Sequence, residues 1–523
     1  MSMLEIAESI LRSKLFWSTT IVFGIYLYLK FVIFNYWKRK GIPHEVPIIP
    51  VGNILPVTLG KQCTGELIQE SYERFKSNPF HGMYMFHIPH LVINDPDLIR
   101  LILIKDFSHF GDRGLYFNND VDPLSGHLFF MPGDEWKHLR SKLSPTFTSG
   151  KMKQMFPLVV KVAEDLKKAL GASIGKSSTV EVKDLLSRYT TDMIASIAFG
   201  VECNSLNDPN AEFREYGKKA VDINPVKVSL MMFFSKLMDI LRIPINSKEV
   251  STFFNTVFSD VISHRRSNNV PRKDFLDLLI QLMDHGKVED DEGIVTDIPK
   301  NNIKIVQNTE NISMSEACAQ AFVFFIAGFE TSSSTSTYCL HELALKPDIQ
   351  DKLRQEINEK LGGRHELSYE DVYAMPYLDK IVSETLRKYP ILPILNRVCL
   401  KDYKIPNSNF CIPKGMNIII PVLGQQKDPK IYPDPEEFRP ERFDSHEIAK
   451  RHAFTYLPFG EGPRICIGKR FGLLQVKVAL IKILSHYRVS VCDKTEIRIK
   501  PTIRNVLLTP VDDVFLKVEK LLS

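Results

Sequence analysis

Hydrophobic residues along most of this chain recur at the three- to four-residue spacing of amphipathic helices. Strand-like apolar stretches occur at 83–93 and 410–421, and on both sides of a loop at 500–513. These patterns predict a mainly α fold with small β-sheets (α+β). The long segments with helical spacing are 151–171, 181–200, 249–266, 274–285, 314–345, 347–361, 376–389 and 468–486. The segment 286–313 is polar and mostly aperiodic, which predicts a surface insertion.

The N-terminal region contains an apolar stretch, Leu15–Trp37, of 23 residues that only Lys30 interrupts. At about 1.5 Å per residue, a helix of this length crosses a hydrocarbon core of roughly 30 Å. The basic residues 38–40 follow at once, and the positive-inside rule places everything after them in the cytosol. A cleaved signal peptide is the alternative, but the stretch is too long and has no small-residue cleavage site. Residues 1–40 are therefore predicted to be a single-pass transmembrane anchor with a basic stop signal.

The segment after the anchor, 41–54, carries prolines at positions 43, 47 and 50, so no helix can run through it. It is predicted to be a stiff tether to a catalytic body at 55–523. Within that body, 226–245 is a second apolar region that Lys236, Asp239 and Arg242 interrupt. It is too polar to span a membrane, and it predicts either a buried helix pair or a monotopic patch in the same membrane.

Composition excludes several classes of function. The net charge of the 523 residues is only +5, and the basic run at 38–40 is the only dense one, which argues against nucleic-acid binding. The 8 cysteines form no C-x-x-C pair, so neither a disulfide scaffold nor a zinc ribbon is indicated. No G-x-G-x-x-G sequence opens a helix, so the chain shows no flavin or nicotinamide fingerprint.

One cysteine, Cys466, lies in the glycine-rich sequence PFGEGPRICIGKRFG. Taken alone, it is compatible with a core residue, half of a disulfide, a zinc ligand, a nucleophile or the lone protein ligand of a metal cofactor. The glycines permit a tight turn close to a flat cofactor, and a helix beginning near 468 favours a thiolate. The pattern F-x-x-G-x-R-x-C-x-G is filled by Phe459, Gly462, Arg464, Cys466 and Gly468.

A second motif, AGFETSSS, lies within the long predicted helix at 314–345. Small Ala327 and Gly328 leave room over a flat cofactor, and the Thr331 hydroxyl beside the Glu330 carboxylate can pass protons to dioxygen. The alternative is that Thr331 only bonds back to its own helix.

Three further elements occur in the order W-x-x-x-R, E-x-x-R and P-E-R-F. Their residues are Trp136, Arg140, Glu384, Arg387 and the segment Pro440–Phe443. Together with the two motifs above they resemble the cytochrome P-450 superfamily, and longer stretches such as LSPTFTSGKMK and RKDFLDLLIQL resemble its insect microsomal, xenobiotic-metabolising branch.

The resemblance implies the cytochrome P-450 fold with haem b as cofactor. It implies that Cys466 ligates the iron, that Arg464, Trp136 and Arg140 meet the haem propionates, and that Phe459 packs near the cysteine sulfur. Glu330 and Thr331 are implied to relay protons. Glu384, Arg387 and Arg442 are implied to form a structural charge triad.

The implied function is a haem-thiolate monooxygenase of lipophilic molecules, such as plant allelochemicals or insecticides. The expected partners are NADPH-cytochrome P-450 reductase, with Lys137, Lys142, Lys469 and Arg470 as candidate docking residues, and cytochrome b5. The expected location is the endoplasmic reticulum membrane, with the body on the cytosolic side. The alternatives are turnover of an endogenous lipid or hormone, a reductase-independent haem-thiolate isomerase, and a non-catalytic haem carrier.

Overall fold

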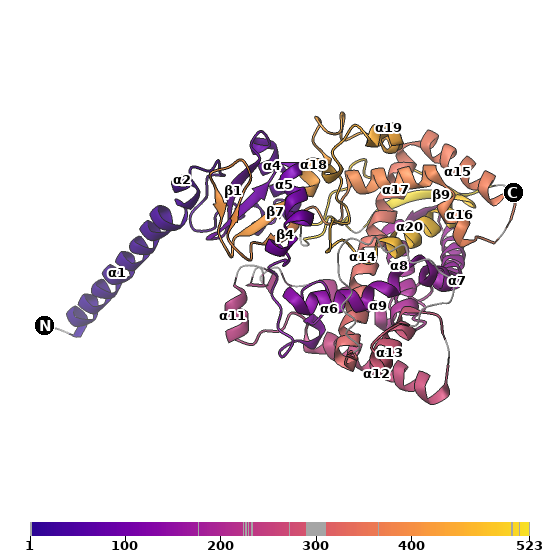
Figure 1. Cartoon of the computed structure of the whole chain (residues 1–523), viewed down its shortest axis with the longest axis horizontal. Helices are drawn as coiled ribbons and strands as arrows, with labels where there is room; N and C mark the ends of the chain where they lie inside the picture. Colours follow the sequence, from indigo (N-terminus) through magenta and orange to yellow (C-terminus); the bar gives the residue numbers. More distant parts are fainter. Residues whose placement is uncertain are drawn as a thin grey trace.

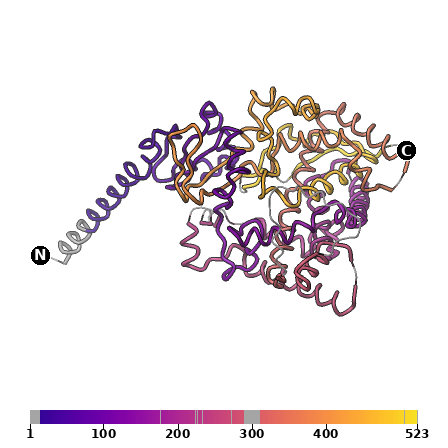
Figure 2. Tube along the Cα trace, in the orientation of Figure 1, coloured from indigo at the N-terminus to yellow at the C-terminus, as the bar shows by residue number. Residues whose placement is uncertain are grey.

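The computed structural model describes residues 3–521, apart from 176, 223, 225, 226, 229, 232, 233, 271, 289–309, 365, 504, 505 and 512. Most of the predicted insertion at 286–313 therefore lies outside the described residues. A long N-terminal helix projects from a body that has a β-rich part beside this helix and a larger helical part beyond it (Figures 1 and 2).

The helical part follows the predicted pattern closely. Each of the eight predicted segments contains an α-helix, and the ends agree within three residues except in 181–200, where the α-helix ends at Ile194 and a π-helix (Ala195–Phe199) continues it. These helices are α7 (Ser149–Ile174), α8 (Val182–Ile194), α12 (Lys248–Asn268), α13 (Phe275–His285), α14 (Met314–Leu345), α15 (Pro347–Leu361), α17 (Pro376–Lys388) and α20 (Lys469–Leu484). The other main helices are α4 (Thr64–Phe75), α6 (Gly133–Leu143), α9 (Glu212–Val221) and the short α11 (Ser235–Ile240).

The β-rich part is built on a four-stranded sheet in the order β1-β2-β7-β4. The strands are β1 (Phe80–Met85), β2 (Ile88–Ile93), β4 (Leu395–Val398) and β7 (Asn417–Ile420). Only β2 and β7 pair in parallel. The stretch predicted as one strand-like piece at 83–93 is in fact a hairpin, with Phe86 at a positive φ of 50° in its turn. Smaller sheets join β3 (Thr179–Glu181), β9 (Phe515–Lys520) and β8 (Tyr487–Ser490), and join β5 (Tyr403–Lys404) to β6 (Cys411–Ile412).

Helix α14 forms the centre of the helical part, with α8 and α20 beside it (Figure 1). It begins at a capping box, in which the Glu316 N–H donates to Ser313 Oγ at 3.2 Å and the Ser313 N–H donates to Glu316 Oε2 at 2.8 Å. The residues 332–344 are all buried. A buried central helix of this kind holds its side chains in fixed directions, which suits a catalytic site.

The N-terminal helix α1 (Met3–Tyr28) continues through a π-helical turn (Leu29–Ile33) to α2 (Tyr36–Arg39). The segment Lys14–Arg39 contains an 18-residue window with a mean hydropathy of 1.5, and it is long and apolar enough to cross a membrane. Two aromatic residues near the end of the predicted span, Phe34 and Trp37, are buried in the body. An aromatic residue at the end of an apolar stretch has the same sequence pattern whether it faces lipid or protein.

Trp37 fills a socket on strand β1. Its indole Nε1 donates to the carbonyl of Met83 at 3.1 Å, and its backbone N–H donates to the Tyr84 hydroxyl at 3.2 Å. A Cβ atom on Gly82 would lie only 2.3 Å from the indole, so the socket requires glycine there. The segment predicted as a tether also bonds to this strand, since the Gly82 N–H donates to the carbonyl of Pro43 and the Glu45 N–H donates to the carbonyl of Gly82. It contains no helix within 41–54, as predicted, but it lies against the sheet.

Replacing Trp37 by alanine should destabilise the catalytic body. Truncation of a fully buried tryptophan costs about 3–5 kcal/mol, and here the hydrogen bond from the indole to the Met83 carbonyl is lost as well. Trp17→Ala is the matched control, because the Trp17 side chain is 62% exposed. Chemical denaturation in detergent should show a lower midpoint for Trp37→Ala alone; equal midpoints for the two variants would contradict the socket.

Candidate active site

The loop that carries Cys466 is shaped by glycines. Gly460 and Gly462 have φ values of 68° and 76°, a region that other residues rarely adopt. A Cβ atom on Gly462 would lie 2.0 Å from the carbonyl oxygen of Leu103, so this part of the loop admits only glycine. The Cys466 N–H donates to the carbonyl of Phe459 at 2.9 Å, which closes the loop just before α20 begins at Lys469. The Cys466 side chain is exposed to a space that this loop borders.

The surroundings of Cys466 act on its charge in two directions. Cys466 is open to the space beside the loop, but the protein around it still limits the solvation of a thiolate and so raises the pKa of the thiol. The backbone N–H of Gly468 and the positive charges of Arg140, Arg113 and Lys469 lower the pKa. Within the described residues, no group of three His, Cys, Asp or Glu side chains is placed to hold a metal ion. A metal bound by Cys466 would therefore have at most one further ligand of these types among the described residues.

Four arginines with little compensating negative charge surround this position: Arg113, Arg140, Arg397 and Arg464. Burial lowers the pKa of Arg464 to about 9, helped by repulsion from Arg397 and Arg140. Burial also lowers the pKa values of Arg140 and Arg397 to about 10. In the described part of the chain, Asp112, 3.5 Å from Arg464, is the only carboxylate that pairs with any of the four.

Arg464 is held firmly although part of it has no partner. Its Nε donates to the carbonyl of Gly111 at 2.5 Å, its Nη2 donates to the carbonyl of Met131 at 3.0 Å, and its guanidinium lies 4.0 Å from the centre of the Trp136 ring. Its Nη1 atom is buried without a hydrogen-bond partner, and so is Arg397 Nε. Buried guanidinium groups with donors that lack a hydrogen-bond partner indicate that an anion is missing from the site.

These residues fit haem. Its two propionates supply the negative charge that the arginines lack, and the exposed sulfur of Cys466 is available to its iron. The structure brings together the predicted residues Cys466, Arg464, Trp136 and Arg140, while Phe459 contributes its carbonyl to the Cys466 N–H. Sequence reasoning missed Arg113 and Arg397. The signal for Arg397 was a charged residue in the short apolar strand LNRV, where it is 3% exposed.

The second motif forms a polar turn of α14. Ala327 is exposed although its helix is central, and a Cβ atom on Gly328 would lie 2.5 Å from Ile194 Cδ1. The Thr331 hydroxyl donates to the Ala327 carbonyl at 2.5 Å, which is the back-bonding considered as an alternative above. Glu330 instead pairs with Lys183 of α8, and no hydrogen bond between Glu330 and Thr331 is present.

Gln475 connects the two motifs. Its Nε2 donates to the carbonyl of Gly328 at 3.1 Å and also contacts the Ser332 hydroxyl. Because Gln475 lies on α20, the helix that follows Cys466 is bonded to α14 at the AGFETSSS turn. The two motifs, distant in sequence, are therefore parts of one site.

The charge triad predicted behind the site is confirmed. Glu384 and Arg387 pair through two hydrogen bonds of 2.8 and 2.9 Å, and both side chains are fully buried. Arg442 Nε lies 3.3 Å from Glu384 Oε1. The triad joins α17 to the 3-10 turn Pro440–Phe443.

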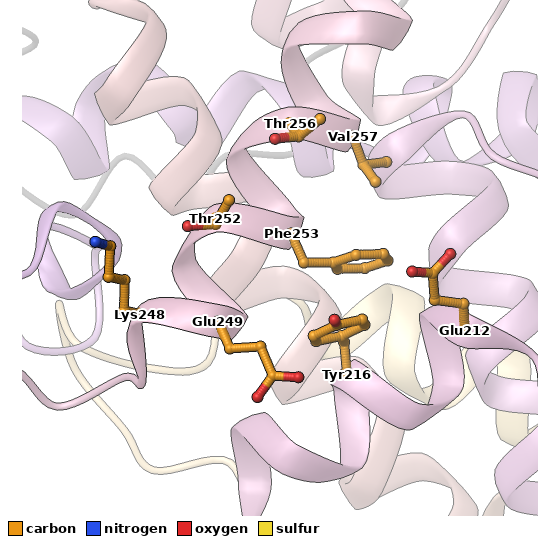
Figure 3. Close-up of a pocket in the computed structure, with 8 residues that line it drawn as sticks. All are labelled: Glu212, Tyr216, Lys248, Glu249, Thr252, Phe253, Thr256 and Val257. Atoms are coloured by element: carbon orange, nitrogen blue, oxygen red, sulfur yellow. The ribbon is translucent and has the colours of Figure 1, made fainter.

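A separate hollow of about 570 Å³ lies between α9 and α12 (Figure 3). The rings of Tyr216 and Phe253 are stacked in it with their centres 4.0 Å apart, beside the carboxylates of Glu212 and Glu249. None of the predicted site residues lines it. This hollow is therefore not part of the site around Cys466.

Comparison with known proteins identifies the fold. The family model described as "Cytochrome P450" matches residues 43–517. "Probable cytochrome P450 6a14" of Drosophila melanogaster is 43% identical over 96% of this chain and 98% of its own length. "Cytochrome P450 6A1" of Musca domestica is 39% identical over 97% and 98%, and "Cytochrome P450 6k1" of Blattella germanica is 42% identical over 94% and 93%.

Glu384→Gln should destabilise the protein strongly, because it leaves two arginines buried beside a neutral side chain. Breaking a buried ion pair from one side costs about 3–5 kcal/mol. Glu441→Gln is the control, since its pair with Lys352 is exposed and worth about 0–1 kcal/mol. Thermal unfolding should separate the two variants clearly, and a similar small shift for both would argue against the triad.

Proposed function

Because the chain belongs to the cytochrome P450 family, it is a monooxygenase that uses haem b, and we propose that it oxidises lipophilic xenobiotics such as plant allelochemicals or insecticides. The family also implies a reductase partner and lipophilic substrates. The similarity to insect relatives supports the proposed substrate class. The observation that carries the proposed site is the exposed residue Cys466 beside four arginines, of which Arg397 and Arg464 are buried.

In this proposal Cys466 is the iron ligand, and haem, once bound, supplies the activation of dioxygen and the transfer of one oxygen atom. Arg464, Arg140, Arg113 and Arg397 neutralise the propionates. Trp136 supports Arg464 through its ring face. Phe459 packs near the sulfur and excludes water from it.

The reaction converts a substrate C–H bond to C–OH and releases the second oxygen atom as water, consuming two electrons and two protons. Glu330 and Thr331 are proposed to pass these protons inward. The hydroxyl of Thr331 donates to Ala327, but its oxygen still accepts hydrogen bonds, so it can receive one proton and hand on another.

The membrane location is also part of the proposal. Helix α1 would span the endoplasmic reticulum membrane, with the exposed Lys38 and Lys40 on the cytosolic side. Ile240 and Leu241, at the end of α11, are 77% and 58% exposed. Figure 1 shows α11 on the same side of the body as α1, which supports the monotopic patch rather than a buried helix pair.

Electrons are proposed to come from NADPH-cytochrome P-450 reductase, with cytochrome b5 as a second donor. Lys142 is the weakest candidate docking residue, because its Nζ already donates to the carbonyl of Glu310 at 2.6 Å. Lys137 pairs with Asp134. Lys469 is exposed at the start of α20, next to the Cys466 loop, and is the better placed contact for an acidic flavoprotein.

The central test is a reduced carbon monoxide difference spectrum followed by product analysis. We expect the red-shifted band of thiolate-bound haem, absent from Cys466→Ala, and reductase-dependent oxidation of members of a panel of allelochemicals, insecticides and endogenous lipids. An imidazole-type spectrum would exclude the proposed ligand. Oxidation of endogenous lipids alone would reassign the substrate class, and conversion without reductase would indicate an isomerase.

Arg397→Leu tests the arginine cluster. Charge-assisted hydrogen bonds are worth about 1.5–3 kcal/mol, so haem should pass to apomyoglobin roughly 10- to 100-fold faster than from the unmodified protein. Arg266→Leu is the control, because this arginine forms an exposed pair with Asp284. Unchanged haem retention in Arg397→Leu would show that Arg397 does not bind the cofactor.

A further inference from the structure

Lys183 is a buried cation between α8 and α14 that none of the motifs includes. Its side chain is only 5% exposed. Its Nζ lies 2.7 Å from Glu330 Oε1, 3.1 Å from Ser333 Oγ and 3.3 Å from Ser334 Oγ. An ammonium group has three hydrogen-bond donors, so all three are used on one turn of α14.

The same contacts fix the direction of Glu330. Its Oε1 accepts a hydrogen bond from Lys183 and a second, of 3.2 Å, from the hydroxyl of Ser334. The carboxylate is thereby turned toward α8, while Thr331, next along the helix, bonds to Ala327. Without these two bonds, nothing else that is described would hold the Glu330 side chain in this orientation.

The backbone beneath Lys183 is rigid. Lys183 is the second residue of α8, and Glu181, the residue that ends β3, caps this helix. Glu181 Oε1 accepts hydrogen bonds from the N–H groups of Lys183 at 2.9 Å and of Val514 at 3.1 Å. The backbone position of Lys183 is therefore fixed by strand β3, the Glu181 cap and helix α8 together, and this in turn fixes where its ammonium group can lie.

Stability alone does not explain why Lys183 and Glu330 are buried as an ion pair, because well-packed apolar residues of similar volume would stabilise the fold as well or better. We propose that Lys183 is a positioning residue that holds Glu330 for proton delivery. This inference rests on the proton-relay role given to Glu330 above. Lys183 touches neither substrate nor cofactor in this scheme and acts through Glu330.

The expected consequence concerns how dioxygen is used. Productive turnover combines one dioxygen, two electrons and two protons with the substrate, giving alcohol and water. When protons arrive at the wrong place, the same electrons and protons leave with both oxygen atoms as hydrogen peroxide. A misplaced Glu330 should therefore lower the yield of product per NADPH while NADPH consumption continues.

The test compares Lys183→Met, Lys183→Arg, Glu330→Gln and the double variant Lys183→Met/Glu330→Gln, each with the reductase and a lipophile that the unmodified protein oxidises. We expect Lys183→Met to lower product per NADPH by about tenfold, the lower end of what a displaced proton-transfer group costs, with a matching rise in peroxide. Lys183→Arg should restore at least half of the yield. The double variant should be no worse than Glu330→Gln, because the two residues act in one step.

Lys482→Met is the matched control. Lys482 is 5% exposed and pairs with Glu164 across α20 and α7, so this variant also loses a buried ion pair, but far from Glu330. It should keep the product yield of the unmodified protein. A readout independent of turnover is the carboxylate region of the infrared spectrum, in which Lys183→Met should shift a band that Glu330→Gln removes.

The outcomes separate the inference from the proposed function. Full product yield in Lys183→Met with a tenfold loss in Glu330→Gln would overturn the role of Lys183 and leave that of Glu330. Full yield in Glu330→Gln would overturn both. Additive losses in the double variant would make Lys183 merely structural. If Lys183→Met fails to retain haem, Ser334→Ala carries the test, since it removes one contact from each partner and should lower the yield about twofold; an unchanged yield would then refute the proposal.

Discussion

Four guanidinium groups gather beside Cys466 in the interior of the protein, and this concentration of positive charge is the constraint on which the rest of the site depends. Like charges repel strongly where water is excluded, and Asp112 is the only carboxylate in the described chain that pairs with any of the four. Such an arrangement is stable only when an anion completes it. In the proposed site the propionates of haem would meet that need, and cofactor binding would then be coupled to folding.

The same constraint explains why the site draws on distant parts of the chain. Arg113 precedes α6, Arg140 lies on α6, Arg397 lies on β4 and Arg464 belongs to the cysteine loop. In the proposed site, all four segments would meet the same two carboxylates. Three consecutive residues of α14 are fixed by hydrogen bonds from other segments: Gly328 by Gln475, Phe329 by Thr190 and Glu330 by Lys183. The proposal assigns the neighbouring Ala327 and Thr331 to the cofactor side.

Much of this architecture was predictable from sequence, and the failures have a common physical cause. Periodicity located the long helices, and the motifs located Cys466 and Glu384, because both signals lie within a few neighbouring residues. Arg397 and Lys183 are single charges in ordinary local sequence. Both side chains are important because of burial and of neighbours that are distant in sequence. Arg397 lies near Arg464, 67 residues later, and Lys183 bonds to Glu330, 147 residues later. No local sequence pattern contains these neighbours. The roles of Arg397 and Lys183 could therefore be inferred only from the three-dimensional packing.

The N-terminal boundary shows the same limit from another side. Hydropathy includes Trp37 in the apolar stretch, and the structure shows that its indole packs against Gly82 and donates its N–H to Met83. The last turn of the stretch therefore packs on the catalytic body. Residues 43–45 then continue as backbone partners of β1. A helix joined in this way cannot pivot freely on its tether. If α1 spans a bilayer, its direction therefore fixes the tilt of the body, and the exposed apolar end of α11 is held on the membrane side without needing strong lipid contacts of its own.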